Sequence, residues 1–271
     1  MRTRKLLTVL ALIPALAWTL FPLLWILTAS FKTELSLYAK PPQWIFSPIL
    51  ENYKRVLFNI PFFEYLTNSL LIATGTTLGS LVLGTLAAYG FSRTRFWGSQ
   101  ALRFLILVTR MVPRITLVVP YYLMMLKTGM LDTYTGLIIA YISFAMPFSI
   151  WLLIGFFDDV PLEVEEAALV DGCTPVGTLV RVVIPIAAPG LAVAAIFAFL
   201  VSWNEFLFAL ILSGVHSKTL PVVIAGLTTD LGPLYGEMSA AAVMVMLPNV
   251  LMTLVLQRYV VKGLTLGAVK G

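Results

Sequence analysis

Long stretches without any charged residue dominate this chain. Five of them extend over at least 20 residues, namely residues 6–31, 65–92, 133–157, 182–204 and 238–257. Each can cross about 30 Å of hydrocarbon as an α-helix, which rises about 1.5 Å per residue. The runs are apolar on all sides, whereas the strands of a membrane barrel alternate apolar and polar residues. The chain is therefore expected to be an all-α integral membrane protein.

A sixth apolar segment, about residues 102–126, differs from the others because it contains Arg110 and Arg114. Pro113 and Pro120 are expected to kink its helix. With this segment included, six transmembrane helices are expected within a single domain, residues 1–271. Their expected bounds are 7–29, 66–90, 104–126, 133–156, 188–212 and 238–260. The first is interpreted as an uncleaved helix, because its apolar run is longer than the core of a secretory signal.

The composition agrees with a membrane location and excludes several classes of protein. Charged residues make up 11% and hydrophobic residues 59% of the 271 residues, whereas ordinary soluble domains contain about 25% charged residues. This excludes a soluble globular enzyme, a disordered protein and a nucleic-acid-binding module. Because Cys173 and His216 are the only residues of their types, an intramolecular disulfide is excluded and a His/Cys metal cluster is not expected.

The distribution of Lys and Arg predicts the orientation. With the N-terminus inside, the inner segments hold ten of these residues and the outer segments six. Both termini are therefore expected in the cytoplasm, in a multi-pass protein of the cell (inner or plasma) membrane. The first outer loop, about residues 31–65, is rich in Pro and aromatic residues. These aromatic residues are interpreted either as interfacial anchors or as part of a docking surface.

The inner loop 158–187 breaks the positive bias, because it holds six acids and one base, Arg181. The acids are Asp158, Asp159, Glu163, Glu165, Glu166 and Asp171. Pro161 suits the first turn of a short helix, whose N-terminus the acids favour, and Gly172 is expected to end it. Thr174 and Pro175 are expected to cap a second helix, which runs to about Ile184 and ends at Pro185.

Spacing places Val164, Ala167, Ala168 and Asp171 on one face of the first short helix. The two alanines beside acidic residues would let this face seat closely in a groove of another protein. The alternative is a helix lying on the membrane surface. Such helices usually carry Lys and Arg toward the anionic lipid. The acidic composition therefore favours a protein-docking helix.

These residues carry a resemblance to a known family. Glu166-Ala167-Ala168, three residues, Gly172, nine residues and then Val182-x-Ile184-Pro185 resemble the EAA signature of ABC importer permeases, E-A-A-x3-G-x9-I-x-L-P. Val182 and Ile184 are conservative departures from it. The segment from Ser202 to Phe206, Ser-Trp-Asn-Glu-Phe, resembles a segment of carbohydrate-type permeases, and the ending from Gln257 to Gly271 resembles their tail. The whole chain resembles the shorter permease subunit of maltose-type sugar importers.

The resemblance implies a division of labour with other proteins. In that family the loop is a coupling helix held by a cytoplasmic ATPase dimer, beside a second homologous permease subunit, and an extracytoplasmic solute-binding protein delivers cargo. It implies coupling roles for Glu163, Glu166, Ala167, Ala168, Asp171, Gly172 and Pro185. The sequence has no G-x-x-x-x-G-K-[ST] phosphate loop. The chain is therefore expected not to be an enzyme and to bind no cofactor, with ATP and Mg on the ATPase.

Polar residues within the apolar segments are candidates for the substrate path. They are Arg110, Arg114, Trp203, Asn204, Glu205 and Asn249. Arg110 and Arg114 lie four residues apart and are expected to share a helix face. They are interpreted as lining the path, or as structural groups through an ion pair with Glu205 or snorkelling of Arg110. Glu205 is interpreted as a sugar contact or a partner of Arg, and Asn249 as an interhelical hydrogen-bonding residue or a sugar contact.

The expected cargo is a sugar or oligosaccharide, with glycerol 3-phosphate or a polyol as alternatives. An ion-coupled secondary transporter is a rival interpretation, which would favour repeated broken helices and buried acids. The sequence shows one acid in an apolar segment and no matching halves. An intramembrane enzyme is disfavoured, since no nucleophile–base or dicarboxylate pair is evident. Gly75-x3-Gly79 is expected to permit close helix packing.

Overall fold

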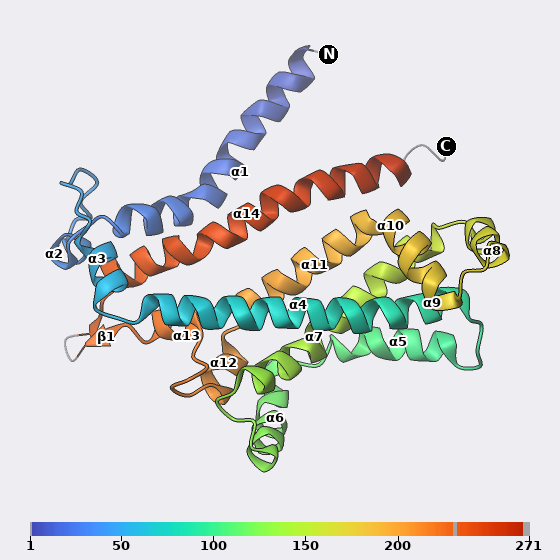
Figure 1. Ribbon diagram of the computed structural model, residues 1–271. Helices are drawn as coiled ribbons and strands as arrows, with labels where there is room; N and C mark the ends of the chain where they lie inside the picture. The colour runs from blue at the N-terminus through green and yellow to red at the C-terminus, as the bar shows by residue number, and fades with distance from the viewer. Residues whose placement is uncertain (1, 230–231, 268–271) are drawn as a thin grey trace. The chain divides into compact units, whose positions relative to one another are not determined.

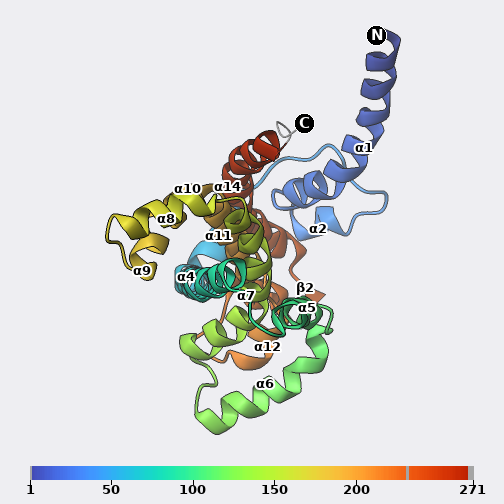
Figure 2. The same ribbon diagram turned by 90° about the vertical axis from the view of Figure 1, so that its right-hand side faces the viewer.

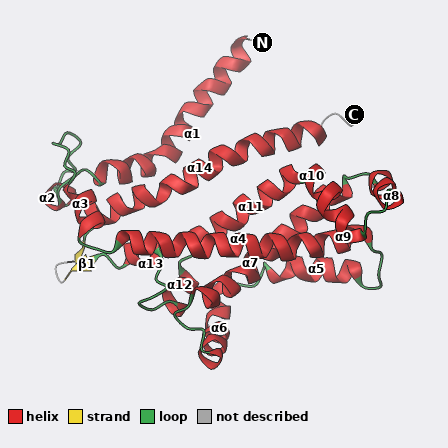
Figure 3. Ribbon diagram, viewed as in Figure 1, coloured by secondary structure: helices red, strands yellow, loops and turns green. Residues whose placement is uncertain are grey.

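A computed structural model describes residues 2–229 and 232–267 of the chain, and the side chains of residues 12–229, 232–255 and 257 (Figure 1). The basic side chains at residues 2–5 and the tail residues 258–271, on which part of the orientation and resemblance rests, lie outside the described side chains. The described chain is mostly helix, with one pair of short antiparallel strands, β1 Thr228–Thr229 and β2 Gly232–Pro233 (Figure 3).

Four helices in the described part of the chain are long and apolar enough to cross a membrane. They are α1 Arg2–Ala29, α4 Phe62–Arg93, α7 Tyr134–Asp158 and α14 Tyr235–Gly267. They coincide with four of the six predicted helices, although α1, α4 and α14 extend several residues beyond the predicted bounds. The other two predicted helices are each divided, and the prediction of one continuous helix was wrong in both cases.

The segment predicted as a helix over 104–126 forms α5 Ser99–Thr109 and α6 Arg114–Thr128. Pro113 directly precedes α6 and has no N–H group with which to continue the hydrogen bonds of α5. The sequence predicted a kink at this proline, and the structure shows a complete break. Pro120, the second predicted kink, lies inside α6 without ending it.

The segment predicted as a helix over 188–212 forms α11 Ala188–Trp203 and α12 Leu207–Leu212. Side chains satisfy the backbone at the break. Asn204 Nδ2 donates to the carbonyl of Leu200 at 2.8 Å, and Glu205 Oε1 accepts from the N–H of Phe208 at 2.9 Å. An unwound turn within an apolar segment requires such replacement partners, because hydrocarbon offers none.

The chain forms two compact units, Met1–Glu64 with Val223–Pro248 and Tyr65–Val222 with Asn249–Gly271. The first unit contains α2 Glu34–Leu37, α3 Glu51–Phe58 and both strands. Its loop is organised around Lys32, which is 3% exposed. Lys32 Nζ donates to the carbonyl of Gln43 at 2.7 Å and lies over the rings of Trp25 and Phe46. Part of the aromatic content of loop 31–65 is therefore packed within this unit.

In the second unit α7 is the central helix, against which α5, α11 and α12 pack. The contacts are close: a Cβ atom at Gly190 of α11 would collide with the ring of Phe156 on α7. Cβ atoms at Gly75 and Gly79 of α4 would collide with Ile138 and Ile142 of α7 in the same way. The predicted close packing at this glycine pair is confirmed.

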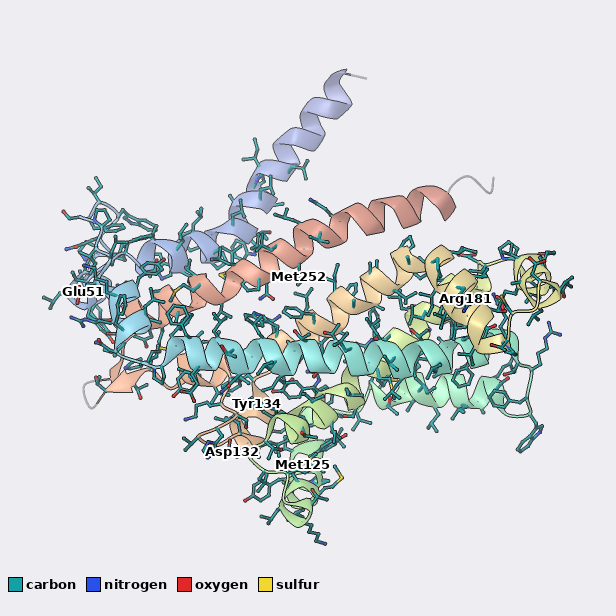
Figure 4. All side chains as sticks on the ribbon, viewed as in Figure 1. Glu51, Met125, Asp132, Tyr134, Arg181 and Met252 are labelled. Carbon is teal, nitrogen blue, oxygen red and sulfur yellow. The ribbon has the colours of Figure 1, made fainter. Side chains whose placement is uncertain are left out.

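The loop after α12 is fixed by the carboxylate of Asp132, which precedes α7 (Figure 4). It accepts hydrogen bonds from the N–H groups of residues 214–217, at 2.7–3.1 Å, and from the Ser217 hydroxyl at 2.9 Å. Burial raises the pKa of Asp132, but the N–H groups of His216, Ser217 and Gly214 and the Ser217 hydroxyl outweigh it, so the pKa lies well below its usual range. Asn68 adds a second connection, because its amide donates to the carbonyls of His216 and Lys218.

We predict that Asp132→Asn destabilises the protein by about 2 kcal/mol, since an amide oxygen cannot replace both carboxylate oxygens as acceptors. A depressed pKa stabilises the fold above the unfolded pKa, about 3.9 for Asp. The difference should therefore be complete at neutral pH and shrink only as the pH falls below about 4. Thermal unfolding in detergent at several pH values measures it, with Glu64→Gln, an exposed acid, as control. Equal unfolding temperatures for Asp132→Asn and wild type at pH 7 would contradict the prediction.

Candidate functional site

The acidic loop 158–187 forms two short helices joined by a tight turn. The first, α8, spans Leu162–Val170, and Gly172 follows with φ +88°, a conformation that favours glycine. Thr174 caps α9 Pro175–Thr178 by accepting from the N–H of Gly177 at 3.1 Å. These features are as predicted. Figure 2 shows α8 and α9 beside each other, before the chain passes through α10 into α11.

The predicted end of the second helix at Pro185 was wrong. After α9 the chain forms a π-helical turn, Leu179–Val183, and Pro185 lies inside α10 Ile184–Ile186. The wider turn accommodates a proline, which cannot donate to the carbonyl four residues before it. The change of direction comes at Ala187, where the segments Pro175–Ile186 and Ala188–Trp203 are bent by 83°.

A buried ion pair attaches the first turn of α8 to the end of α4. Glu165 Oε1 lies 2.5 Å from Arg93 Nη2 and accepts from Arg93 Nε at 2.6 Å. Tyr89 on α4 donates its hydroxyl proton to Glu165 Oε2 at 2.8 Å. The side chains of Arg93 and Glu165 are only 12% and 7% exposed. The carboxylate of Glu165 therefore anchors loop 158–187 to α4.

The same arginine also holds the end of α7. Arg93 Nη2 donates to the carbonyls of Phe157 at 2.9 Å and Val160 at 3.1 Å. One guanidinium thus joins α4, α7 and α8, as its five donors in a rigid fork permit. In the sequence, Arg93 is one of the ten basic residues of the inner segments and Glu165 is one of the acids that favour the start of a helix, so their connection was not predicted. An arginine at the end of an apolar run and an acid in the following loop were the available signals.

The anchor determines which predicted coupling residues are accessible in this chain. Ala168 is 8% exposed, so it packs on the chain itself and not on the outer face. The exposed members of the predicted set on α8 and its turn are Glu163, Glu166, Ala167, Asp171 and Gly172. The surface of α8 that is available to a partner is therefore mixed, because these carboxylates stand beside exposed apolar side chains, namely Leu162, Val164, Leu169 and Val170.

A second cluster lies where the divided segments meet. Arg114 Nη1 at the start of α6 lies 2.8 Å from Glu205 Oε2 in the break before α12. Glu205 is 4% exposed, and its other oxygen accepts from the N–H of Phe208. Of the interpretations of Arg114, the structure therefore shows the ion pair. Arg110 and Arg114 do not share one helix face as predicted, because the break at residues 110–113 separates them.

The remaining predicted path residues occupy different surroundings. Asn204 and Asn249 exchange amide hydrogen bonds at 3.2 and 2.9 Å, the helix-to-helix contact predicted as one alternative. Trp203 is 2% exposed and stacks on Phe199, so its ring belongs to the core. Arg110 lies over the ring of Phe148 at 4.7 Å. Among the described residues, no group of three His, Cys, Asp or Glu side chains is arranged to hold a metal ion.

Comparisons with known proteins agree with these features. Residues 80–265 match the family described as binding-protein-dependent transport system inner membrane component. The chain is 37% identical over 262 residues to the trehalose/maltose transport system permease protein of Thermococcus litoralis, covering 93% of this chain and 92% of that protein. It is 38% identical over 258 residues to the trehalose transport system permease protein of Mycobacterium tuberculosis, covering 94% and 93%.

A third relative is the sulfoquinovosyl glycerol transport system permease protein of Agrobacterium fabrum, 36% identical over 254 residues, with 93% of this chain and 89% of that protein covered. A chain of a bacterial ABC transporter involved in the import of the acidic polysaccharide alginate has the same fold, with a TM-score of 0.80 and 24% identity. The matched region covers 95% of this chain and 96% of the transporter chain.

The family model spans more than half of the chain, and the coverage of the relatives is nearly complete on both sides. The resemblance to ABC importer permeases is thereby confirmed, and with it the membrane location. The chain belongs to the family of binding-protein-dependent transport system inner membrane components.

Proposed function

We propose that this ABC permease subunit forms half of the translocation pathway for a sugar or oligosaccharide and is driven by a separate ATPase through α8. The names of the relatives, which transport trehalose, maltose or sulfoquinovosyl glycerol, support a sugar cargo. Glycerol 3-phosphate and polyols remain the alternative cargoes. The chain itself is a transport subunit and not an enzyme, with ATP and Mg bound by the ATPase.

The observation that carries the coupling role is the division of charge on α8. Glu165 is buried in an ion pair with Arg93, whereas Glu163 and Glu166 remain exposed on the same helix. A helix that is anchored to two membrane helices and exposes both acids and apolar side chains suits a groove on a soluble partner that is apolar with a basic rim. We infer that closure of an ATPase dimer moves α8 together with the ends of α4 and α7, because Arg93 joins all three.

The proposal includes the arrangement in the membrane. Residues 1–271 form one permease domain with six spans, of which the third and fifth are the divided segments 99–128 and 188–212. Both termini and loop 158–187 are cytoplasmic. Arg110, Arg114, Glu205, Asn204 and Asn249 lie along the path, and Trp203 supports the break from the core. A second permease subunit, an ATPase dimer and an extracytoplasmic solute-binding protein complete the importer in membrane lipid.

The first prediction concerns docking. Co-expressed with its genomic neighbours and purified in detergent, the wild-type chain should retain an ATPase, and Glu166→Lys should weaken this association about tenfold by placing like charges opposite each other. Gly172→Pro should have a similar effect, because proline cannot adopt φ +88°. The control is Glu51→Lys, the same charge reversal on exposed α3.

Two results would speak against the docking prediction. One is an ATPase that binds all three variants as well as wild type. The other is a wild-type chain that binds no ATPase and still transports in ATP-depleted vesicles with an ion gradient, which would favour the secondary transporter.

The second prediction separates docking from coupling. Glu165→Ala should keep the ATPase bound, since the exposed acids are intact. It should lower the amount of cargo transported per ATP hydrolysed about tenfold. It leaves Arg93 buried without its carboxylate, which typically costs about 3–5 kcal/mol. The transport-to-hydrolysis ratio of Glu165→Gln should lie between those of wild type and Glu165→Ala, because the amide oxygen of glutamine still accepts a hydrogen bond from Arg93. The transport-to-hydrolysis ratio in proteoliposomes measures the effect, and an unchanged ratio in Glu165→Ala would refute the role of the anchor.

A further inference from the structure

A cavity of about 330 Å³ lies beside the break between α5 and α6. Its lining includes Thr109, Arg110, Arg114, Tyr121, Ser143 and Phe144. Guanidinium groups, hydroxyl groups and an aromatic ring therefore meet in one space. Ligand pockets in proteins have volumes of about 300–1,000 Å³, so this cavity is large enough for a small polar molecule.

The cavity lies at the break in the middle of its divided segment. α5 has 11 residues and α6 has 15, which correspond to about 16 Å and about 22 Å of helix on the two sides of the break. Both arginines are exposed in this chain, and a charged group near the middle of a membrane segment is costly unless it is paired or reaches water. Within an assembled importer each arginine of the cavity therefore requires a compensating partner or water.

Only one of the two arginines has such a partner in the described part of the chain. Glu205 compensates Arg114, and both of its oxygens are occupied, by Arg114 and by the N–H of Phe208. Arg110 contacts the ring of Phe148, and no described residue provides it with a carboxylate or another hydrogen-bond acceptor. The ring of Phe148 packs against one face of the Arg110 guanidinium, so the N–H groups at the edge of the guanidinium can still donate hydrogen bonds. The described side chains around the cavity thus leave one positive charge without an anion.

The hydroxyl groups of the cavity complement this charge. Thr109 Oγ1 donates to the carbonyl of Ile106 and Ser143 Oγ to that of Ala140, both at 2.6 Å. Because each hydroxyl proton is already engaged, the oxygens offer lone pairs to a ligand that donates. A ligand with one anionic group and several hydroxyl groups would match both kinds of residue.

We propose that Arg110 binds the anionic group of an acidic sugar, such as a carboxylate, sulfonate or phosphate ester, while Thr109 and Ser143 accept hydrogen bonds from its hydroxyl groups. This inference rests on the proposed function and specifies the class of cargo. The guanidinium fork pairs with an oxyanion through two parallel hydrogen bonds. Arg114 and Glu205 form the neutral pair that fixes the break next to the ligand, so Glu205 positions the site and does not contact cargo.

The test uses the co-purified importer complex in nanodiscs of phosphatidylcholine, with radiolabelled glucuronate and glucose as probes. Glucuronate should bind saturably and at least about tenfold more tightly than glucose, since a hydrogen bond to a charged group contributes about 1.5–3 kcal/mol. Arg110→Gln should abolish this difference. Arg110→Lys should retain part of it, because lysine keeps the charge without the fork.

Two matched variants test whether any arginine or any loss of charge has the same effect. Arg103→Gln removes an arginine that lines a separate cavity between α5 and α7 and should leave glucuronate binding intact. Lys127→Gln removes an exposed positive charge from the last turn of α6, outside the lining of the cavity, and should also leave the preference for glucuronate intact. Size-exclusion profiles and retained ATPase show that each variant is folded and assembled.

Several outcomes would overturn the inference. Equal affinities for the two probes, or an unchanged preference in Arg110→Gln, would do so. Loss of glucuronate binding when phosphatidylglycerol is added to the nanodiscs would assign Arg110 to a lipid headgroup instead of cargo. The same preparations report separately on the proposed function: an ATPase that co-purifies while glucuronate does not bind refutes only the acidic cargo, whereas a wild-type chain without an ATPase contradicts the permease assignment itself.

Discussion

The buried guanidinium of Arg93 determines what loop 158–187 can do. Its hydrogen bonds reach the first turn of α8 and the last carbonyls of α7 from the end of α4. Without this contact α8, a helix of nine residues, would lose its ion pair to α4 and its connection to the end of α7, and short helices are marginal in water. With it, a force on the exposed acids of α8 acts on two long helices at once. In the proposed coupling, the transmission of movement would therefore depend on a residue outside the loop that receives it.

The two divided segments obey the same physical rule as that anchor. A polar backbone in hydrocarbon must find partners, and at both breaks side chains supply them or the sequence omits the donor. Pro113 has no N–H to satisfy, while Glu205 accepts from the N–H of Phe208 and pairs with Arg114 across the gap. The ion pair therefore ties one break to the other. This connection explains why Arg114 and Glu205 lie between the two breaks, although an apolar contact there would cost less free energy to bury.

The sequence predicted the elements governed by local chemistry and missed those governed by tertiary contacts. Four long helices, the turn at Gly172 and the cap at Thr174 follow from apolar length, a positive φ and a side-chain acceptor, all of which act within a few residues. The breaks at 110–113 and 204–206 were not predicted as breaks, since apolar composition alone does not distinguish a continuous helix from two halves. The burial of Glu165 and Ala168 depends on Arg93 and on the packing of α8. The helical spacing of residues within the loop therefore could not predict it.

Neighbouring like charges differ at both sites, through burial in the case of Glu165 and Glu166 and through an ion pair in the case of Arg114 and Arg110. Glu165 and Glu166 are adjacent, yet one is sealed against Arg93 and the other is exposed. Arg110 and Arg114 line the same cavity, yet Glu205 neutralises only Arg114. In each pair the compensated residue fixes the backbone, and the other keeps its charge for something outside this chain. A buried carboxylate with both oxygens occupied is accordingly a structural group, even when it lies within a motif shared with transport proteins. In the function proposed for this chain, recognition would fall to the neighbour whose charge the fold leaves uncompensated.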